Sequence, residues 1–253
     1  MKMELVSSVF LAILCSGSVF GAKRYEKDIL PTKDGDLEIT FLGHGSLLFT
    51  LNGMVIAVDP YSQVAEYALL PKADLILVTH QHYDHLDLDA IQPIRTGKTV
   101  IVANMAATEK VFGAVVLKNG EERTFRGVRT DAPEIRVAAV PAYNLVHMRD
   151  PGVPYHPKGE GNGYVLTFGD KRVYVAGDTE NISEMRELAG IDVAFLPMNL
   201  PYTMTPEMVA DAARRFRPKI LYPYHFGDTD TSRLAELLKD EKGIEVRIRG
   251  NMK

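Results

Sequence analysis

The segment THQHYDH, which runs from Thr79 to His85, constrains this chain more than any other. It contains three of the seven histidines in a chain of 253 residues. His80 and His82 lie two positions apart and project to the same side of an extended segment, so they can bind one metal ion. Asp84 and His85 follow at a turn and can face a second ion nearby. Four residues of ligand type within six positions therefore predict a metal site rather than a solvated polar loop.

The apolar runs around this segment predict two packed sheets. The run ADLILVTH, which leads into the histidines, is expected to form a buried strand. Asn52-Gly53 separates two runs rich in β-forming residues and predicts a hairpin, and Gly169-Asp170 does the same in the second half. Helices are expected over residues 105–113, 182–190 and 205–218, and an irregular segment over residues 144–163. Short strands followed by mixed strands and helices, twice over, predict an α/β fold with helices outside two sheets.

Two further residues of ligand type directly follow apolar strands. Asp178 follows the run VYVAG, and His225 follows the run LYPY. Sites in folds of this kind gather at the carboxyl ends of strands, so both side chains are candidate ligands. Taken alone, an aspartate after glycine is more often a turn residue, and a single histidine after a strand is a weak signal. The residues themselves leave both interpretations open.

The first 21 residues have the pattern of a secretory signal peptide. Lys2 precedes an apolar run from Leu5 to Cys15 that is too short to span a membrane as a helix, and the residues up to Gly21 fit a cleavage site. A buried N-terminal helix or an uncleaved anchor is the alternative. Cleavage would leave one domain, residues 22–253, without a transmembrane segment and without the only cysteine. The sequence therefore predicts a periplasmic or secreted protein with no disulfide and no cysteine nucleophile.

The charge distribution argues against a nucleic-acid partner. The formal net charge is −4, and no basic stripe is visible along the chain. The densest basic stretch, residues 214–219, is expected to close a helix, where cations match the negative end of the helix dipole. The expected partner is a small-molecule substrate.

The motifs THQHYDH, AGDT and YHFG, in this order, closely resemble the metallo-β-lactamase superfamily. The run ITFLGHGSLLF followed by IAVDP resembles the branch that contains ascorbate-6-phosphate lactonase and related metal-dependent hydrolases. The resemblance extends from about Leu37 to Phe226, and its first motif is highly specific. It implies a four-layer αββα sandwich with two divalent metal ions between the sheet edges. Zinc is the default for histidine and aspartate ligands, and manganese and iron are the other candidates.

The resemblance also implies a role for each site residue. The implied ligands are His80 and His82 for the first ion, Asp84, His85 and His225 for the second, and Asp178 for both. Asp59 resembles the aspartate that orients the histidine loop. Asp84 is also the candidate for orienting the attacking water and moving its proton. His44, between two glycines, matches a histidine of the lactonase-like branch and is expected to contact substrate; the alternative is a turn histidine bonded to backbone.

Asn144 departs from the family pattern. The family usually has a third histidine for the first ion at this position, and an asparagine oxygen is a poor zinc ligand. His156 lies in HPKGEGNGY, which resembles one sub-branch, and is expected to supply the missing ligand. The alternatives are His147, a substrate-contacting role for His156, or a site with a single metal ion. Tyr143, Tyr202 and Lys158 are further candidates for lining the pocket.

The implied activity is hydrolysis of a small ester, lactone or phosphodiester by a metal-bound hydroxide. The alternatives are a nuclease or phospholipase-type phosphodiesterase, and an inactive metal-binding scaffold. A true β-lactamase fits less well, because the GDT aspartate stands where a cysteine ligand would be expected and the opening motif is lactonase-like.

Overall fold

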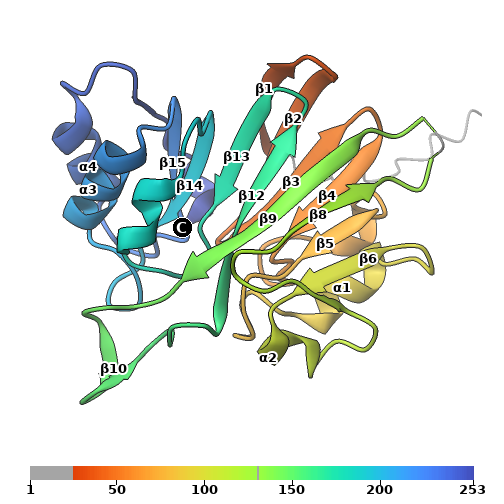
Figure 1. Cartoon of the computed structure of the whole chain (residues 1–253), viewed down its shortest axis with the longest axis horizontal. Coiled ribbons are helices and arrows are strands. Elements are labelled where there is room, and N and C mark those ends of the chain that lie inside the picture. The colour runs from red at the N-terminus through yellow and green to blue at the C-terminus, as the bar shows by residue number, and fades with distance from the viewer. Residues whose placement is uncertain (1–24, 130) are drawn as a thin grey trace, which may run out of the picture.

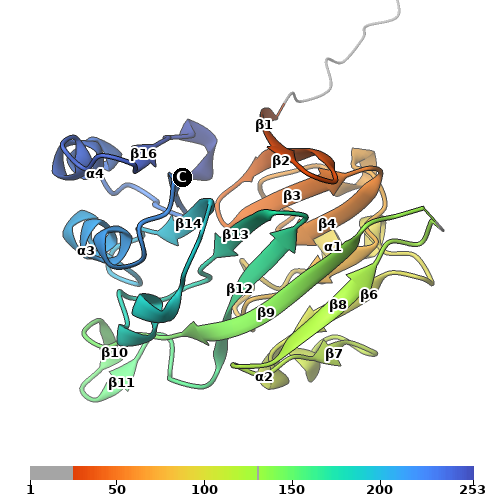
Figure 2. The same cartoon turned by 45° about the horizontal axis from the view of Figure 1, so that its top comes forward.

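The computed structural model of the chain describes residues 25–129 and 131–253. Two seven-stranded sheets pack face to face, and helices cover their outer surfaces (Figure 1 and Figure 2). This arrangement is the predicted αββα sandwich. The predicted signal peptide, residues 1–21, lies outside the described residues.

The first sheet has the strand order β1-β2-β3-β4-β5-β6-β7, antiparallel from β1 to β4 and parallel from β4 to β7. Its strands are β1 (Glu26–Thr32), β2 (Gly35–Gly43), β3 (Ser46–Leu51), β4 (Met54–Val58), β5 (Leu75–Leu77), β6 (Val100–Ala103) and β7 (Val115–Val116). Its helical segments are α1 (Leu88–Ile94), α2 (Met105–Thr108) and the 3-10 helix η1 (Tyr67–Leu69). Asn52 and Gly53 both have positive φ and form the tight turn between β3 and β4, as predicted.

The second sheet repeats this plan. Its order is β16-β15-β14-β13-β12-β9-β8, antiparallel from β8 to β13 and parallel from β13 to β16. Its strands are β8 (Glu122–Arg126), β9 (Glu134–Ala142), β12 (Gly161–Phe168), β13 (Lys171–Val175), β14 (Val193–Pro197), β15 (Ile220–Tyr224) and β16 (Glu245–Val246). Its helical segments are α3 (Pro206–Phe216), α4 (Thr231–Leu238) and the 3-10 helices η2 (Ser183–Glu187) and η3 (Gly250–Met252). The remaining strands, β10 (Met148–Asp150) and β11 (Val153–Pro154), form a separate hairpin.

The core lies between the two sheets and continues beneath the helices. Aromatic rings from both sheets meet in the middle, where Phe195 of β14 stacks on Tyr222 of β15 and Phe41 of β2 packs against both. The other face of the first sheet is covered by α1, whose Ile91 and Ile94 are fully buried. Each sheet therefore buries both faces, which explains why β4, β5 and β14 are apolar throughout rather than alternating.

Helix α3 follows the sequence prediction closely. The Thr205 side chain accepts a hydrogen bond from the Met208 amide, and Pro206 occupies the first helical position, where its missing N–H costs nothing. Arg214 and Arg215 lie in the last turn, as expected for the basic stretch. Val209, Ala210, Ala212, Ala213 and Phe216 form the buried side of the helix.

Three expected segments are different in the structure. Residues 182–190 form only the short η2, because Ile182, Met185 and Leu188 are buried at a spacing of three, which matches three residues per turn. In residues 105–113 only the first turn is helical, as α2, and Phe112 beyond it is 95% exposed. The segment 144–163 is not irregular throughout, since it contains β10 and β11 and the start of β12.

In both views the β10–β11 hairpin projects from the end of β9, away from the two sheets (Figure 1 and Figure 2). Within residues 25–129 and 131–253, none of the helices combines the length and the apolar character needed to cross a membrane.

Candidate metal centre

The carboxyl ends of parallel strands in both sheets supply the candidate ligands. In the first sheet, Asp59 follows β4 and the His80–His85 segment follows β5. In the second sheet, Asp178 follows β13 and His225 follows β15. The two sets lie together, because Asp178 Oδ1 is 3.5 Å from His85 Nε2. The location agrees with the general position of sites at strand ends in such folds.

These residues form three overlapping groups, and within each group one possible ligand atom per residue lies within 4.8 Å of the others. The groups are His80, His82 and His156; His44, Asp84, His85 and His225; and His80, His85 and Asp178. Two donors at about 2.0–2.2 Å from one zinc ion lie at most about 4.4 Å apart, a limit that His80 Nε2 and His82 Nδ1 meet at 3.0 Å. All seven predicted ligands belong to these groups, and His44 joins them.

The first group contains the two histidines predicted for the first ion and the predicted replacement for the third. His80 Nε2 and His82 Nδ1 are 3.0 Å apart. The His156 ring lies 5.1 Å from the His80 ring and 5.0 Å from the His82 ring, measured between centroids. Burial and the charges of neighbouring groups lower the pKa of His82 to about 4 and hold the pKa of His80 well below its ordinary value. Both rings are therefore neutral at pH 7, the form that binds metal.

Asp178 lies between the first group and the second. Its Oδ2 is 3.2 Å from His156 Nε2 and 4.0 Å from His80 Nε2. Its Oδ1 is 2.8 Å from His225 Nδ1 and 3.5 Å from His85 Nε2. Each oxygen thus faces a different set of imidazoles, which is the arrangement expected of a shared carboxylate.

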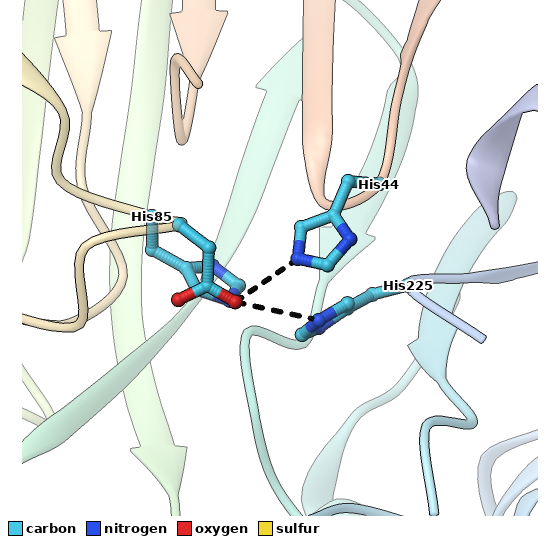
Figure 3. A group of neighbouring side chains, drawn as sticks. His44, His85 and His225 are labelled. Carbon is cyan, nitrogen blue, oxygen red and sulfur yellow. Dashed lines mark hydrogen bonds and ion pairs between the residues drawn. The ribbon is translucent and has the colours of Figure 1, made fainter. Parts of the chain in front are cut away.

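The second group surrounds Asp84. Its Oδ2 is 3.0 Å from His44 Nε2, 3.7 Å from His225 Nε2 and 3.8 Å from His85 Nε2. Figure 3 shows His44, His85 and His225 close together, with His44 on the loop between β2 and β3. Burial would raise the pKa of Asp84, but the hydrogen bond with His44 and the charge of His85 outweigh burial and lower it. Asp84 is therefore ionised at neutral pH.

His85 gives the clearest test of whether a cation fits this site. Its Nδ1 lies 2.8 Å from Asp59 Oδ2, so Nδ1 is occupied, and its Nε2 is buried with no hydrogen-bond partner in the described part of the chain. Burial lowers the pKa of His85, but Asp178, Asp59 and Asp84 outweigh burial and raise it to about 10. An unpartnered imidazole nitrogen facing carboxylates is a place for positive charge, and a divalent cation supplies that charge. The residues present therefore fit a metal ion.

Asp59 binds Thr79, at the start of the histidine loop, in addition to His85. It is fully buried and has a φ of 44°, and its carboxylate also accepts hydrogen bonds from the Thr79 amide at 2.8 Å and the Thr79 hydroxyl at 2.7 Å. Gly177, directly before Asp178, packs against the same threonine: an added Cβ would lie 3.0 Å from Thr79 Cβ. The ends of β4, β5 and β13 are therefore fixed to one another at Thr79.

Asn144 stands where the family usually has a third histidine, but it belongs to none of the three candidate ligand groups. Its Oδ1 is 2.6 Å from His156 Nδ1, and its Nδ2 donates to Glu180 and to the Tyr202 carbonyl. His147, the alternative ligand, points elsewhere, because its Nδ1 lies 2.7 Å from Glu180 Oε1 and it belongs to none of the three groups. Sequence reasoning missed Glu180, although it directly follows the GDT motif.

A cleft of about 420 Å³ opens onto the centre, and its described lining comprises His44, His82, Tyr83, Asp84, Arg149, Tyr155, His156, Asp178, Asn199, Tyr202 and His225. Tyr202, a candidate pocket residue from the sequence, lines the cleft. Tyr143 and Lys158 do not: Tyr143 is buried and donates a hydrogen bond to Glu184, and Lys158 pairs with the same glutamate at 2.9 Å. Sequence analysis did not identify Arg149, Tyr155 and Asn199, which carry no motif of their own.

Comparison with known proteins gives a consistent result. Residues 38–225 match the family described as the beta-lactamase superfamily domain. A UPF0173 metal-dependent hydrolase from Koribacter versatilis is 34% identical over 223 residues, covering 83% of this chain and 92% of that protein. Another from Solibacter usitatus is 31% identical over 223 residues, covering 84% of this chain and 95% of that protein.

Solved structures agree with these relatives. A crystal structure from Parabacteroides distasonis, named for a metal-dependent hydrolase, is 50% identical with a TM-score of 0.82, covering 89% of this chain and 99% of that one. The metallo hydrolase Igni18 from Ignicoccus hospitalis is 25% identical with a TM-score of 0.69, covering 86% of this chain and 96% of that one.

Proposed function

The chain belongs to the metallo-β-lactamase superfamily as a metal-dependent hydrolase, and on that premise we propose that it hydrolyses a small ester, lactone or phosphodiester with two divalent cations. The observation that carries this proposal is the position of Asp178, whose two oxygens face different histidine groups at 2.8–4.0 Å.

We assign His80, His82 and His156 to the first ion, Asp84, His85 and His225 to the second, and Asp178 to both. This set consists of imidazole and carboxylate donors, which makes zinc the first candidate, with manganese or iron as the alternatives. When bound, such cations would supply a lowered pKa for a coordinated water and stabilisation of the negative charge that develops on the substrate.

Asp84 and His44 form the pair that handles the proton in this proposal. Asp84 is ionised and its Oδ2 lies at the centre of the second group, where it can accept a proton from an attacking water. His44 Nε2, 3.0 Å away, orients that oxygen, and both side chains line the cleft. Because His44 belongs to the same group as Asp84, His85 and His225, it could also serve as a further ligand of the second ion. The metal content of a His44→Ala protein separates the two roles, because an orienting residue leaves the content unchanged and a ligand does not.

The dimensions of the cleft favour a small substrate over a polymer. Its volume of about 420 Å³ falls in the range of small-molecule sites. Of the residues that line it in the described part of the chain, only Arg149 carries a permanent positive charge, whereas a nuclease would need a longer basic surface. We therefore place the nuclease and phospholipase-type activities second.

A single set of assays tests this proposal. The zinc-loaded full chain is assayed for metal content and for turnover of a p-nitrophenyl ester, a γ-lactone, bis(p-nitrophenyl) phosphate, single-stranded DNA and phospholipid vesicles. We expect turnover of one of the first three, abolished by a chelator and restored by zinc. Turnover of DNA or phospholipid alone supports the alternative activities, bound metal without any turnover supports an inactive scaffold, and the absence of metal binding overturns the proposal.

A further inference from the structure

The Asn144 side chain is held in one orientation by acceptors on two sides. It is 5% exposed, and its Nδ2 donates to Glu180 Oε1 at 3.1 Å and to the Tyr202 carbonyl at 2.9 Å. A carboxylate and a carbonyl can only accept hydrogen bonds, so the NH2 group of the amide faces them. The amide oxygen therefore faces the opposite way, toward His156.

Glu180 is the fixed point of this arrangement. The residue is fully buried, and its carboxylate accepts hydrogen bonds from three consecutive amides, those of Leu145, Val146 and His147, at 2.7–2.8 Å. A carboxylate bound by several donors in a buried position cannot rotate without breaking several hydrogen bonds at once. Glu180 thus fixes both the chain after β9 and the direction of the Asn144 amide.

The orientation of Asn144 determines which nitrogen of His156 is protonated. Asn144 Oδ1 is 2.6 Å from His156 Nδ1, and an amide oxygen only accepts, so Nδ1 carries the hydrogen. The backbone supports the pairing, because the Asn144 amide donates to the His156 carbonyl at 2.9 Å. Of the two neutral tautomers, this geometry therefore selects the one in which Nε2 is unprotonated, and Nε2 lies 3.2 Å from Asp178 Oδ2. A cation bound beside this pair would contact both the nitrogen lone pair and the carboxylate oxygen.

We propose that Asn144 is a positioning residue that holds His156 as its Nδ1–H tautomer, with Nε2 directed at the metal site, and that Glu180 holds Asn144 in turn. The inference rests on the proposed function, in which His156 is a ligand of the first ion. A hydrogen bond to the other ring nitrogen fixes the tautomer and the plane of a ligating histidine, and loss of such a partner typically weakens metal binding about 10- to 100-fold. Asn144 thus acts on the metal through His156.

The first measurement is metal retention in matched variants. Zinc-loaded wild type, Asn144→Leu and His147→Ala proteins are challenged with a chelator. Asn144→Leu keeps the size of the side chain but removes the hydrogen-bond acceptor of His156. We expect this variant to bind one of its two zinc ions with about 10- to 100-fold lower affinity, so that the chelator removes one metal equivalent. His147→Ala loses a hydrogen bond to the same Glu180 but leaves His156 untouched, so it should retain zinc like the wild type.

The second measurement reads the tautomer directly in the wild-type chain. In long-range 1H–15N spectra of the full wild-type chain, the His156 signals, assigned with His156→Gln, should show a protonated Nδ1, with Nε2 unprotonated or metal-bound. Asn144→Leu should shift them toward the Nε2–H form. A protonated Nε2 in the zinc-loaded wild type, or Asn144→Leu with unchanged tautomer and zinc affinity, overturns the inference. Wild type that binds no zinc instead overturns the proposed function.

Discussion

At the scale of single residues, the centre consists of imidazoles whose second nitrogen is already occupied. Asp59 occupies Nδ1 of His85, and Asn144 occupies Nδ1 of His156. In each case the remaining nitrogen lies near a different oxygen of Asp178, at 3.5 Å for His85 Nε2 and 3.2 Å for His156 Nε2. The protein thereby fixes the orientation of both rings before a cation is bound, which lowers the cost of assembling the ligand set.

The sequence identifies the candidate ligands much more readily than it identifies these partners. His80 to His85 could be identified because four ligand-type residues lie within six positions. His156 could be inferred because the family's third histidine is replaced by Asn144 and the run HPKGEGNGY resembles one sub-branch of the family. The roles of Asn144 and Glu180 could not be predicted, since they depend on hydrogen bonds between residues 12 and 36 positions apart. Such contacts are set by how the strand ends meet and leave no local pattern.

The shared position of Asp178 leads to a prediction at this scale. We expect Asp178→Ala to lose both metal ions and to lower turnover by more than about 100-fold, because even loss of an outer partner typically costs 10- to 100-fold. Metal analysis and the assays described above measure both effects. Asp192→Ala is the matched control: Asp192 is also buried in the second sheet but binds Lys219 and the Arg172 amide, so metal content should remain unchanged. Full metal content in Asp178→Ala would contradict a shared ligand.

At the scale of elements, most strands and helices could be predicted from the hydrophobic pattern of the sequence and from its turn residues. The β3–β4 hairpin and helix α3 were predicted because Asn52-Gly53 and Thr205-Pro206 are strong local signals. The β10–β11 hairpin was missed because its residues are mostly exposed, so no face of it shows a buried period. Its position is set by the ends of β9 and β12, which lie side by side in the second sheet.

The hairpin leads to a prediction about substrate charge. Arg149 in β10 is exposed and lines the cleft, so it can contact a substrate bound at the centre. An exposed ion pair contributes about 1 kcal/mol, so Arg149→Ala should raise KM about five-fold for a substrate with a remote carboxylate or phosphate. KM for the matching neutral substrate should stay the same. Arg123→Ala, in β8 outside the cleft, is the control. An equal rise in KM for neutral and anionic substrates would show that Arg149 shapes the hairpin rather than binding charge.

At the scale of the whole molecule, the same plan occurs twice, and each half delivers part of the site. In each sheet an antiparallel group leads into parallel strands, and the carboxyl ends of β4, β5, β13 and β15 meet at one edge. The fold class was predictable because two halves with the same strand-and-helix pattern have few ways to bury their apolar faces. Which residues of the two halves touch was not predictable from the pattern and follows from the packing of the sheets.

The export of the protein is a prediction about the whole chain. From the apolar run and Gly21 we propose a periplasmic or secreted protein whose mature form begins at or near Ala22. Intact-mass measurement of the exported protein tests this directly. A variant with Leu11→Arg, which interrupts the apolar run, should remain inside the cell with its full mass. A wild-type mass that still includes residues 1–21 in the exported fraction would exclude cleavage at this position.

Asp28 connects the two ends of the described chain. In β1 it accepts hydrogen bonds from the Tyr222 hydroxyl and from Arg249 Nη2, which is 2.6 Å from each carboxylate oxygen. Burial raises the pKa of Asp28, but the hydrogen bonds and the charge of Arg249 outweigh burial and lower it below the ordinary value. A carboxyl group whose pKa is lowered by folding stabilises the protein above its unfolded pKa, about 3.9, and this contribution is lost as pH falls through the folded pKa.

We therefore expect Asp28→Asn to lower the free energy of unfolding by about 1 kcal/mol at pH 7, a modest value because the group is partly exposed to solvent. At about pH 3 the difference between variant and wild type should shrink, since that pH lies below the unfolded pKa of about 3.9 and the unfolded wild-type chain takes up a proton there. Urea unfolding at both pH values measures the two differences. Asp131→Asn, which removes an exposed aspartate paired with Arg129, is the control and should show neither effect. An Asp28→Asn difference that stays the same at both pH values would mean that its hydrogen-bonding shape, and not its charge, holds β1 to the end of the chain.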